Sequence, residues 1–296
     1  ENTAGYWDFR GHITGEGNLQ LVAHNSNGAT VFDFTNSTPK PEWFSGELNL
    51  VNPNGGAIQL IIGHGATEAG SVDSRWKNTV MNLTPTSMDS IYDADTEEGR
   101  AHATVLALEG NAQIKGLIGG ADGSGVTASG QFNLTLGSDK AEDVFIYNGT
   151  LGSDTIYTGG LDDTGSIVTV NSAVNNNLSI TKTGANTQIF QGSNSLHHIN
   201  MEGGKLTFTQ ALVADHLNLK AGELTTLGET TIDSANLNTS SIWNIGANVT
   251  ITDSLTLTGN NLMGAVGGDQ AHILRTGELE EGAEPYVWTA PQRIEL

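Results

Sequence analysis

The chain has 296 residues, enough for one long or two ordinary domains, and contains 38 Gly, 6 Pro and no Cys. Its 12 Lys plus Arg against 33 Asp plus Glu give a formal net charge of -21, which argues against nucleic acid as a partner. The lack of Cys excludes disulfides, thiolate catalysis and Cys-based metal centres. No apolar run approaches the roughly 18 residues of a membrane-spanning helix, so we expect no membrane insertion by this chain.

Short runs of alternating apolar and polar residues fill the N-terminal third. They occur at residues 15–21, 30–34, 44–50 and 56–62. Alternation of this kind predicts strands with one buried face. We therefore assign residues 1–85 to an N-terminal β region.

Two of these runs carry a family resemblance. Residues 15–21 are Gly-Glu-Gly-Asn-Leu-Gln-Leu, and residues 44–50 are Phe-Ser-Gly-Glu-Leu-Asn-Leu. Both resemble the autotransporter-associated β-strand repeat, found in passenger regions of type V secreted proteins. The resemblance covers about the first 60 residues and extends loosely over 178–260. It implies a β-helix that a Gram-negative bacterium secretes or displays at its outer membrane.

An acidic stretch interrupts the strand rhythm at residues 86–105, where we expect a short helix or a solvated loop. Its carboxylates could hold a cation or serve as the paired acids of a glycosidase, because polysaccharide-active β-helices place acids on one face of their coils. A solvated loop is the alternative. The side chains concerned are Asp89, Asp93, Asp95, Glu97 and Glu98.

A tetrapeptide at residues 163–166, Asp-Thr-Gly-Ser, matches the signature of aspartic proteases. That chemistry needs two carboxylates that share one proton, and the chain contains one copy of the motif. If the resemblance holds, Asp163 is catalytic and a second copy of the chain supplies its partner. The alternative is an ordinary surface turn.

The same region resembles the calcium-binding nonapeptide of RTX proteins. Asp154 and Asp163 are nine residues apart within a Gly-rich stretch, and Asp162 adds a third carboxylate. Calcium prefers several such oxygens at once, so these three residues form a candidate calcium site. Turns between neighbouring strands account for the same residues without a ligand.

The region 106–260 shows the clearest repeat. The stretch that starts at His198 aligns with the stretch that starts at His216, 18 residues later. Further units place Leu178 21 residues before Ile199, Leu237 20 residues after Leu217, and Leu255 18 residues after Leu237. Units of this size cannot close a core alone and must stack on their neighbours. We therefore predict an all-β, right-handed parallel β-helix over residues 5–260. The alternative is an antiparallel β-sandwich in the N-terminal third.

The alignment also places His198 and His216 at equivalent positions, with His197 beside them. On stacked coils these rings would approach one another, either as a metal-binding pair or as an ordinary polar ladder. Residues 261–296 have no repeat register. We expect them to form a cap on the open end of the solenoid.

Three functions follow from these patterns. The leading hypothesis is a secreted or surface-displayed structural, adhesive or glycan-binding solenoid, with an extracellular glycoprotein such as mucin or a polysaccharide as partner. The enzyme alternative is an extracellular hydrolase, through Asp163 or through a carboxylate pair. The third is an export module stabilised by calcium. The sequence does not indicate an oligomeric state.

Overall fold

The computed structural model describes residues 5–23, 29–37, 43–51, 57–63, 65–66, 70–84, 104–120, 124–152, 155–161, 167–171, 177–238, 241–258, 261–265, 271–273 and 286–288. In these ranges all regular structure is β, which confirms the all-β prediction. No helix occurs there, and hence none that is long and apolar enough to cross a membrane.

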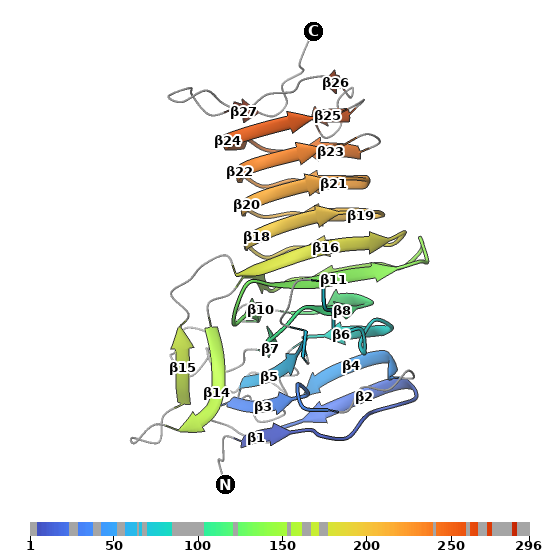
Figure 1. Cartoon of the computed structure of the whole chain (residues 1–296), viewed down its shortest axis with the longest axis vertical. Coiled ribbons are helices and arrows are strands. Elements are labelled where there is room, and N and C mark those ends of the chain that lie inside the picture. The colour runs from blue at the N-terminus through green and yellow to red at the C-terminus, as the bar shows by residue number, and fades with distance from the viewer. Residues whose placement is uncertain are drawn as a thin grey trace.

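The largest sheet follows the long axis of the molecule (Figure 1). Its strands lie in the order β1 (Gly5–Asp8), β3 (Ala29–Asp33), β5 (Ala57–Ile62), β7 (Thr104–Leu108), β10 (Gly125–Ala128), β13 (Thr150–Leu151), β18 (Asn194–Met201), β20 (Leu212–Leu219), β22 (Thr230–Leu237), β24 (Val249–Leu257) and β27 (Tyr286–Trp288). A side branch joins it at β18 and consists of β16 (Leu178–Gly184), β11 (Phe132–Ser138) and β8 (Ala112–Ile114).

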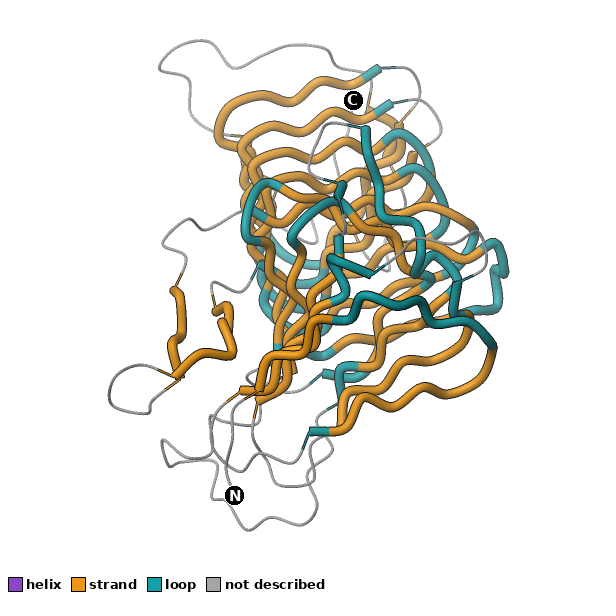
Figure 2. Tube along the Cα trace, turned by 60° about the horizontal axis from the view of Figure 1, so that its bottom comes forward, coloured by secondary structure: helices purple, strands orange, loops and turns teal. Residues whose placement is uncertain are grey.

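Three smaller sheets complete the structure. One contains β12 (Val144–Tyr147), β17 (Thr187–Phe190), β19 (Lys205–Phe208), β21 (Gly222–Thr226), β23 (Ser241–Ile245), β25 (Asn261–Ala265) and β26 (Ala271–Ile273). Another contains β2 (Glu16–Val22), β4 (Ser45–Val51), β6 (Thr79–Asn82) and β9 (Gly116–Ile118). The last is the hairpin of β14 (Thr155–Leu161) and β15 (Ile167–Asn171), which lies beside the stacked strands in Figure 2.

Most neighbouring strands run parallel, which is consistent with the predicted parallel β-helix. Among the described strands, the antiparallel pairs are β14 with β15, β24 with β27 and β25 with β26. The antiparallel sandwich considered for the N-terminal third is wrong, since β1, β3, β5 and β7 pair in parallel, as do β2, β4, β6 and β9. Long connections bring each strand next to its repeat instead of its neighbour in sequence.

The strand register confirms part of the predicted repeat and corrects the rest. His198 pairs with His216, as the sequence alignment predicts. The predicted offsets place Leu178 beside Ile199, Leu217 beside Leu237 and Leu237 beside Leu255, and each is wrong by two residues. Ile180 pairs with Ile199, Leu219 with Leu237, and Leu237 with Leu257. A shift by two leaves every side chain on the same face of a strand, so alternation alone cannot detect it.

One continuous apolar core fills the interior of the stack from Leu21 to Leu257. The strands β3, β5, β7 and β10 are buried on both faces. On their outer face a second cluster forms from Val31, Ile61, Val105 and Ala107. The hairpin strand β14 contacts β1, β3 and β10.

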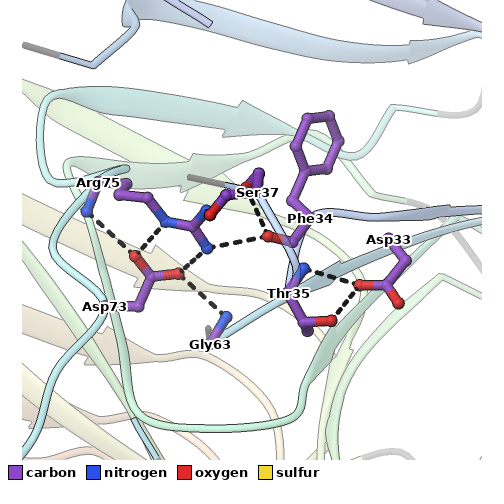
Figure 3. Close-up of polar contacts among 7 residues, drawn as sticks. All are labelled: Asp33, Phe34, Thr35, Ser37, Gly63, Asp73 and Arg75. Carbon is purple, nitrogen blue, oxygen red and sulfur yellow. Dashed lines mark hydrogen bonds and ion pairs between the residues drawn. The ribbon is translucent and has the colours of Figure 1, made fainter. Parts of the chain in front are cut away.

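A buried ion pair ties two N-terminal connections together (Figure 3). The Arg75 guanidinium donates to both carboxylate oxygens of Asp73 at 2.7 Å and to the carbonyl oxygen of Phe34 at 3.0 Å. It also donates to the carbonyl oxygen and the hydroxyl of Ser37. Asp73 in turn accepts a hydrogen bond from the backbone N–H of Gly63. One planar side chain thus links the connection after β3 to the one after β5.

Candidate functional site

The most distinctive polar surface lies where the alternation of buried and exposed residues breaks. In β18, β20 and β22 two consecutive central residues are at least partly exposed, and in β24 the same position holds a longer exposed run. Two outward residues in succession bend a strand, so the stack has a corner here. The four residues of the first two strands form what we call the histidine corner: His197, His198, Asp215 and His216.

The side chains of the histidine corner are in mutual contact. His197 Nδ1 lies 2.8 Å from Asp215 Oδ2, and because an ionised carboxylate only accepts, Nδ1 carries the proton. The rings of His198 and His216 stack with their centroids 4.6 Å apart. The ring of His197 lies edge-on to those of His198 and His216, with centroid distances of 4.1 and 5.9 Å. The sequence alignment predicted this approach of the three rings.

The electrostatics of the corner favour a neutral central ring. Partial burial, followed by the neighbouring rings of His197 and His216, lowers the pKa of His198 from 6.5 to about 4, while Asp215 acts in the opposite direction. His198 is therefore an uncharged hydrogen-bonding group at neutral pH. Its neutral state permits the close stacking with His216.

The corner continues as a column of acids along the stack. Asp233 on β22 accepts a hydrogen bond of 2.7 Å from the Thr252 hydroxyl, and Asp253 on β24 accepts one of 3.1 Å from Ser234. Sequence reasoning did not single out Asp215 or these two acids. The signal was present, because the alignment that pairs His198 with His216 also pairs His197 with Asp215.

Beside the corner, a row of amides follows the outer face of the same strands. Asn200, Asn218 and Asn236 occupy equivalent positions on β18, β20 and β22. Asn218 donates to Asn200 Oδ1 at 3.0 Å, and Asn200 donates to the Thr181 hydroxyl at 3.4 Å. We call Asn200, Asn218, Asn236 and the adjoining Thr181 the amide ladder. Its rungs repeat at the strand spacing of about 4.8 Å.

A second cluster of titratable groups lies at the other end of the stack. The Tyr6 hydroxyl donates to Asp33 Oδ2, and Thr35 donates to Asp33 Oδ1 from its backbone and its hydroxyl at 2.7 and 2.6 Å. Burial, followed by the Asp33 hydrogen bond and charge, raises the pKa of Tyr6 strongly. Burial and the charge of Asp33 also raise the pKa of Glu109. Sequence reasoning missed this cluster, which depends on strands about 25 to 75 residues apart in sequence.

The site residues predicted from motifs lie outside the described part of the chain. Asp154 precedes β14, and Asp162 and Asp163 fall between β14 and β15. The acidic residues 89–98 also lie outside it. The protease dyad, the calcium site and the acidic loop therefore remain predictions.

Among the described side chains, no group of three or more His, Cys, Asp or Glu is placed to hold a metal ion. The stacking of His198 and His216 agrees with this finding. The lone pairs of an imidazole lie in its ring plane, so those of two stacked rings run side by side and do not converge on one ion. The polar-ladder interpretation of these histidines is the one their geometry favours.

No protein-family model, no curated protein and no solved structure matches the chain. The function is therefore inferred from the side chains that the fold brings together. Of these, the histidine corner and the amide ladder form one continuous strip of partly exposed polar groups over β16, β18, β20 and β22.

Proposed function

We propose that the chain is a right-handed parallel β-helix, secreted or displayed on a bacterial surface, that binds an extracellular glycan. The ligand class is a repeating, hydroxyl-rich polymer, either a polysaccharide or the glycan chains of a mucin-like glycoprotein. The observation that carries this proposal is the amide ladder, in which equivalent side chains recur on successive strands next to the histidine corner.

The chemistry of the amide ladder suits sugar hydroxyls. A hydroxyl is both donor and acceptor, and an amide side chain offers both functions on one planar group. Asn200 and Asn218 are partly exposed and Asn236 is exposed, so each retains access to solvent. A polymer that lies along the stack axis meets the same donor and acceptor at every strand, and several weak contacts then act together.

The charge of the protein narrows the class of glycan. With a formal net charge of -21, the surface repels polyanions, and the acids Asp215, Asp233 and Asp253 stand beside the ladder. Neutral polysaccharides avoid this repulsion. We therefore expect neutral glycans to bind more tightly than sulfated or sialylated ones, with the difference greatest at low ionic strength.

A glycan-array or pull-down assay with the double variant Asn200→Ala/Asn218→Ala tests the proposal. Each lost hydrogen bond is worth about 1 kcal/mol, so we expect binding to weaken by about tenfold or more. Thr207→Ala/Thr225→Ala is the matched control, because these residues are also 18 apart and paired in register, but lie on β19 and β21 of another sheet. Equal loss in both double variants, or no binding of the wild type to any neutral glycan, contradicts the proposal.

A further inference from the structure

The histidine corner also has a property that does not depend on any ligand. Three imidazole rings lie with their centroids within 4.1 to 5.9 Å of one another across β18 and β20. The side chains of His197 and Asp215 are only 20% and 29% exposed. Protons added to this group of rings therefore create like charges that are close together and partly shielded from water.

The charged groups around the corner are few in the described structure. On β20 the carboxylate of Asp215 faces His197, and one strand further β22 contributes Asp233. The lysine of β16, Lys182, is buried in the interior and bonded to Thr183 and Asn186. On β21, Glu223 is paired with Lys205 at 2.8 Å on the other sheet.

The remaining packed strand, β13, consists of Thr150 and Leu151 and has no titratable side chain. The hydrogen bond from His197 already engages Asp215. The ring of His198 lies 4.1 Å from that of His197 and 4.6 Å from that of His216, measured between centroids. Each of these two rings disfavours a proton on His198 more strongly than Asp215 favours it.

We propose that the histidine corner is an acid-sensitive opening point of the strand stack, at which β18 and β20 separate when the solution is acidified while the rest of the stack stays paired. The contact between His198 and His216 adds to the backbone pairing of the two strands when both rings are neutral. Protonation of both rings turns this contact into a like-charge repulsion at the middle of the strand pair.

The direction of the pH effect follows from linkage. The pKa of His198 is lowered in the folded chain from 6.5 to about 4, so between these values the unfolded chain binds a proton that the folded chain does not. The contribution of the neutral His198 ring to the free energy of unfolding is therefore fully present above pH 6.5 and is lost as the pH falls toward 4. The window lies in the acidic range that histidine-based sensors use.

Hydrogen exchange of the backbone amides tests the proposal on the intact chain. After correction for the intrinsic pH dependence of exchange, we expect opening of β18 and β20 to increase by more than tenfold, and up to about a hundredfold, between pH 7 and pH 4.5, with little change in β4 or β6. His198→Gln keeps a polar side chain without the titration and should abolish this increase. His12→Gln, which changes an exposed histidine near the N-terminus, should leave it intact.

A direct titration keeps the proposal testable even if a variant folds poorly. In the wild type, the NMR signals of His198 should titrate well below pH 6. An ordinary titration near pH 6.5 overturns the proposal, as does equal acid-induced opening in the wild type and in His198→Gln. Uniform opening of all strands also overturns it, because that outcome assigns the acid response to the whole stack.

Discussion

Gly46 on β4 lies in register beside Gly17 on β2, and a Cβ added to Gly46 would come within 2.1 Å of the Gly17 carbonyl oxygen. Both residues have positive φ, 138° and 106°, which other L-residues rarely adopt. They are the central glycines of the two N-terminal repeat motifs. The motif therefore requires glycine for two separate reasons, backbone conformation and close strand approach.

Alanine substitutions separate these two reasons. Gly17→Ala meets no atom within 4 Å and should cost only the backbone strain, about 1 to 3 kcal/mol of unfolding free energy. Gly46→Ala adds the clash with the backbone of Gly17 and should cost clearly more. Gly11→Ala has neither problem and should stay within about 0.5 kcal/mol of the wild type. Urea unfolding monitored by circular dichroism measures all three, and equal losses at Gly17 and Gly46 would contradict the close approach.

The sequence predicted those features of the fold that depend on local periodicity. Alternation marks the inward residues, and the repeat of the His198 stretch at His216 gives the correct register for that pair. Between Leu237 and Leu257 neither a motif nor a histidine marks the register. Alternation there fits two offsets that differ by two residues equally well, so the sequence cannot decide between them. Asp33 and Glu109 come together only through the stacking of distant strands, for which a single sequence holds no signal.

The buried ion pair of Asp73 and Arg75 leads to a prediction about the N-terminal part. The Arg75 side chain is only 4% exposed, so Arg75→Met leaves a buried carboxylate without its guanidinium and should cost about 3 to 5 kcal/mol. Arg75→Lys should lose most of this as well, because an ammonium group cannot form the two parallel hydrogen bonds.

The control for Arg75 is Arg10→Met. Arg10 is 82% exposed and pairs with Asp8 at 2.9 Å, so its loss should cost less than about 1 kcal/mol. Denaturant midpoints measure both variants. If Arg75→Lys is as stable as the wild type, the forked geometry at Asp73 is not what stabilises these connections.

Lys182 gives a prediction for alkaline pH. It is fully buried in the core, and burial lowers its pKa from 10.5 to about 8. The folded pKa lies below the unfolded value, so burying the charged Lys182 lowers the free energy of unfolding. This loss is greatest below pH 8 and disappears as the pH rises through 10.5.

The variant Lys182→Met removes this titration. The stability difference between Lys182→Met and the wild type should therefore shift in favour of the wild type by on the order of 2 kcal/mol between pH 7.5 and 10.5. Melting temperatures across this range measure the shift. Lys220→Met, at a lysine that is 54% exposed, should show no such trend. A difference that stays constant with pH would mean that Lys182 is not perturbed by burial.

Gln188 joins two sheets through its side chain. It is fully buried on β17, and its amide accepts a hydrogen bond from the Leu117 backbone N–H at 3.1 Å while donating to the Leu117 carbonyl at 2.9 Å. It also approaches the Phe145 carbonyl at 3.3 Å. The side chain thus takes the place of a strand's peptide group beside β9, the last strand of its sheet.

Two substitutions of Gln188 separate shape from hydrogen bonding. Gln188→Leu leaves the N–H and carbonyl of Leu117 buried without this partner and should cost about 2 to 4 kcal/mol. Gln188→Glu keeps the shape but places a carboxylate against two carbonyl oxygens, so at pH 7 it should cost at least as much. Burial raises the pKa of a carboxyl group, so acidification protonates the glutamate and restores one donor. The stability of Gln188→Glu relative to the wild type should therefore rise as the pH falls from 7 to 5, whereas that of Gln188→Leu should not change.

Gln20→Glu, at an exposed glutamine on β2, is the control and should remain within about 0.5 kcal/mol of the wild type at both pH values. Parallel pH profiles for the two Gln188 variants would show that the space the side chain fills matters here and that its hydrogen bonds do not.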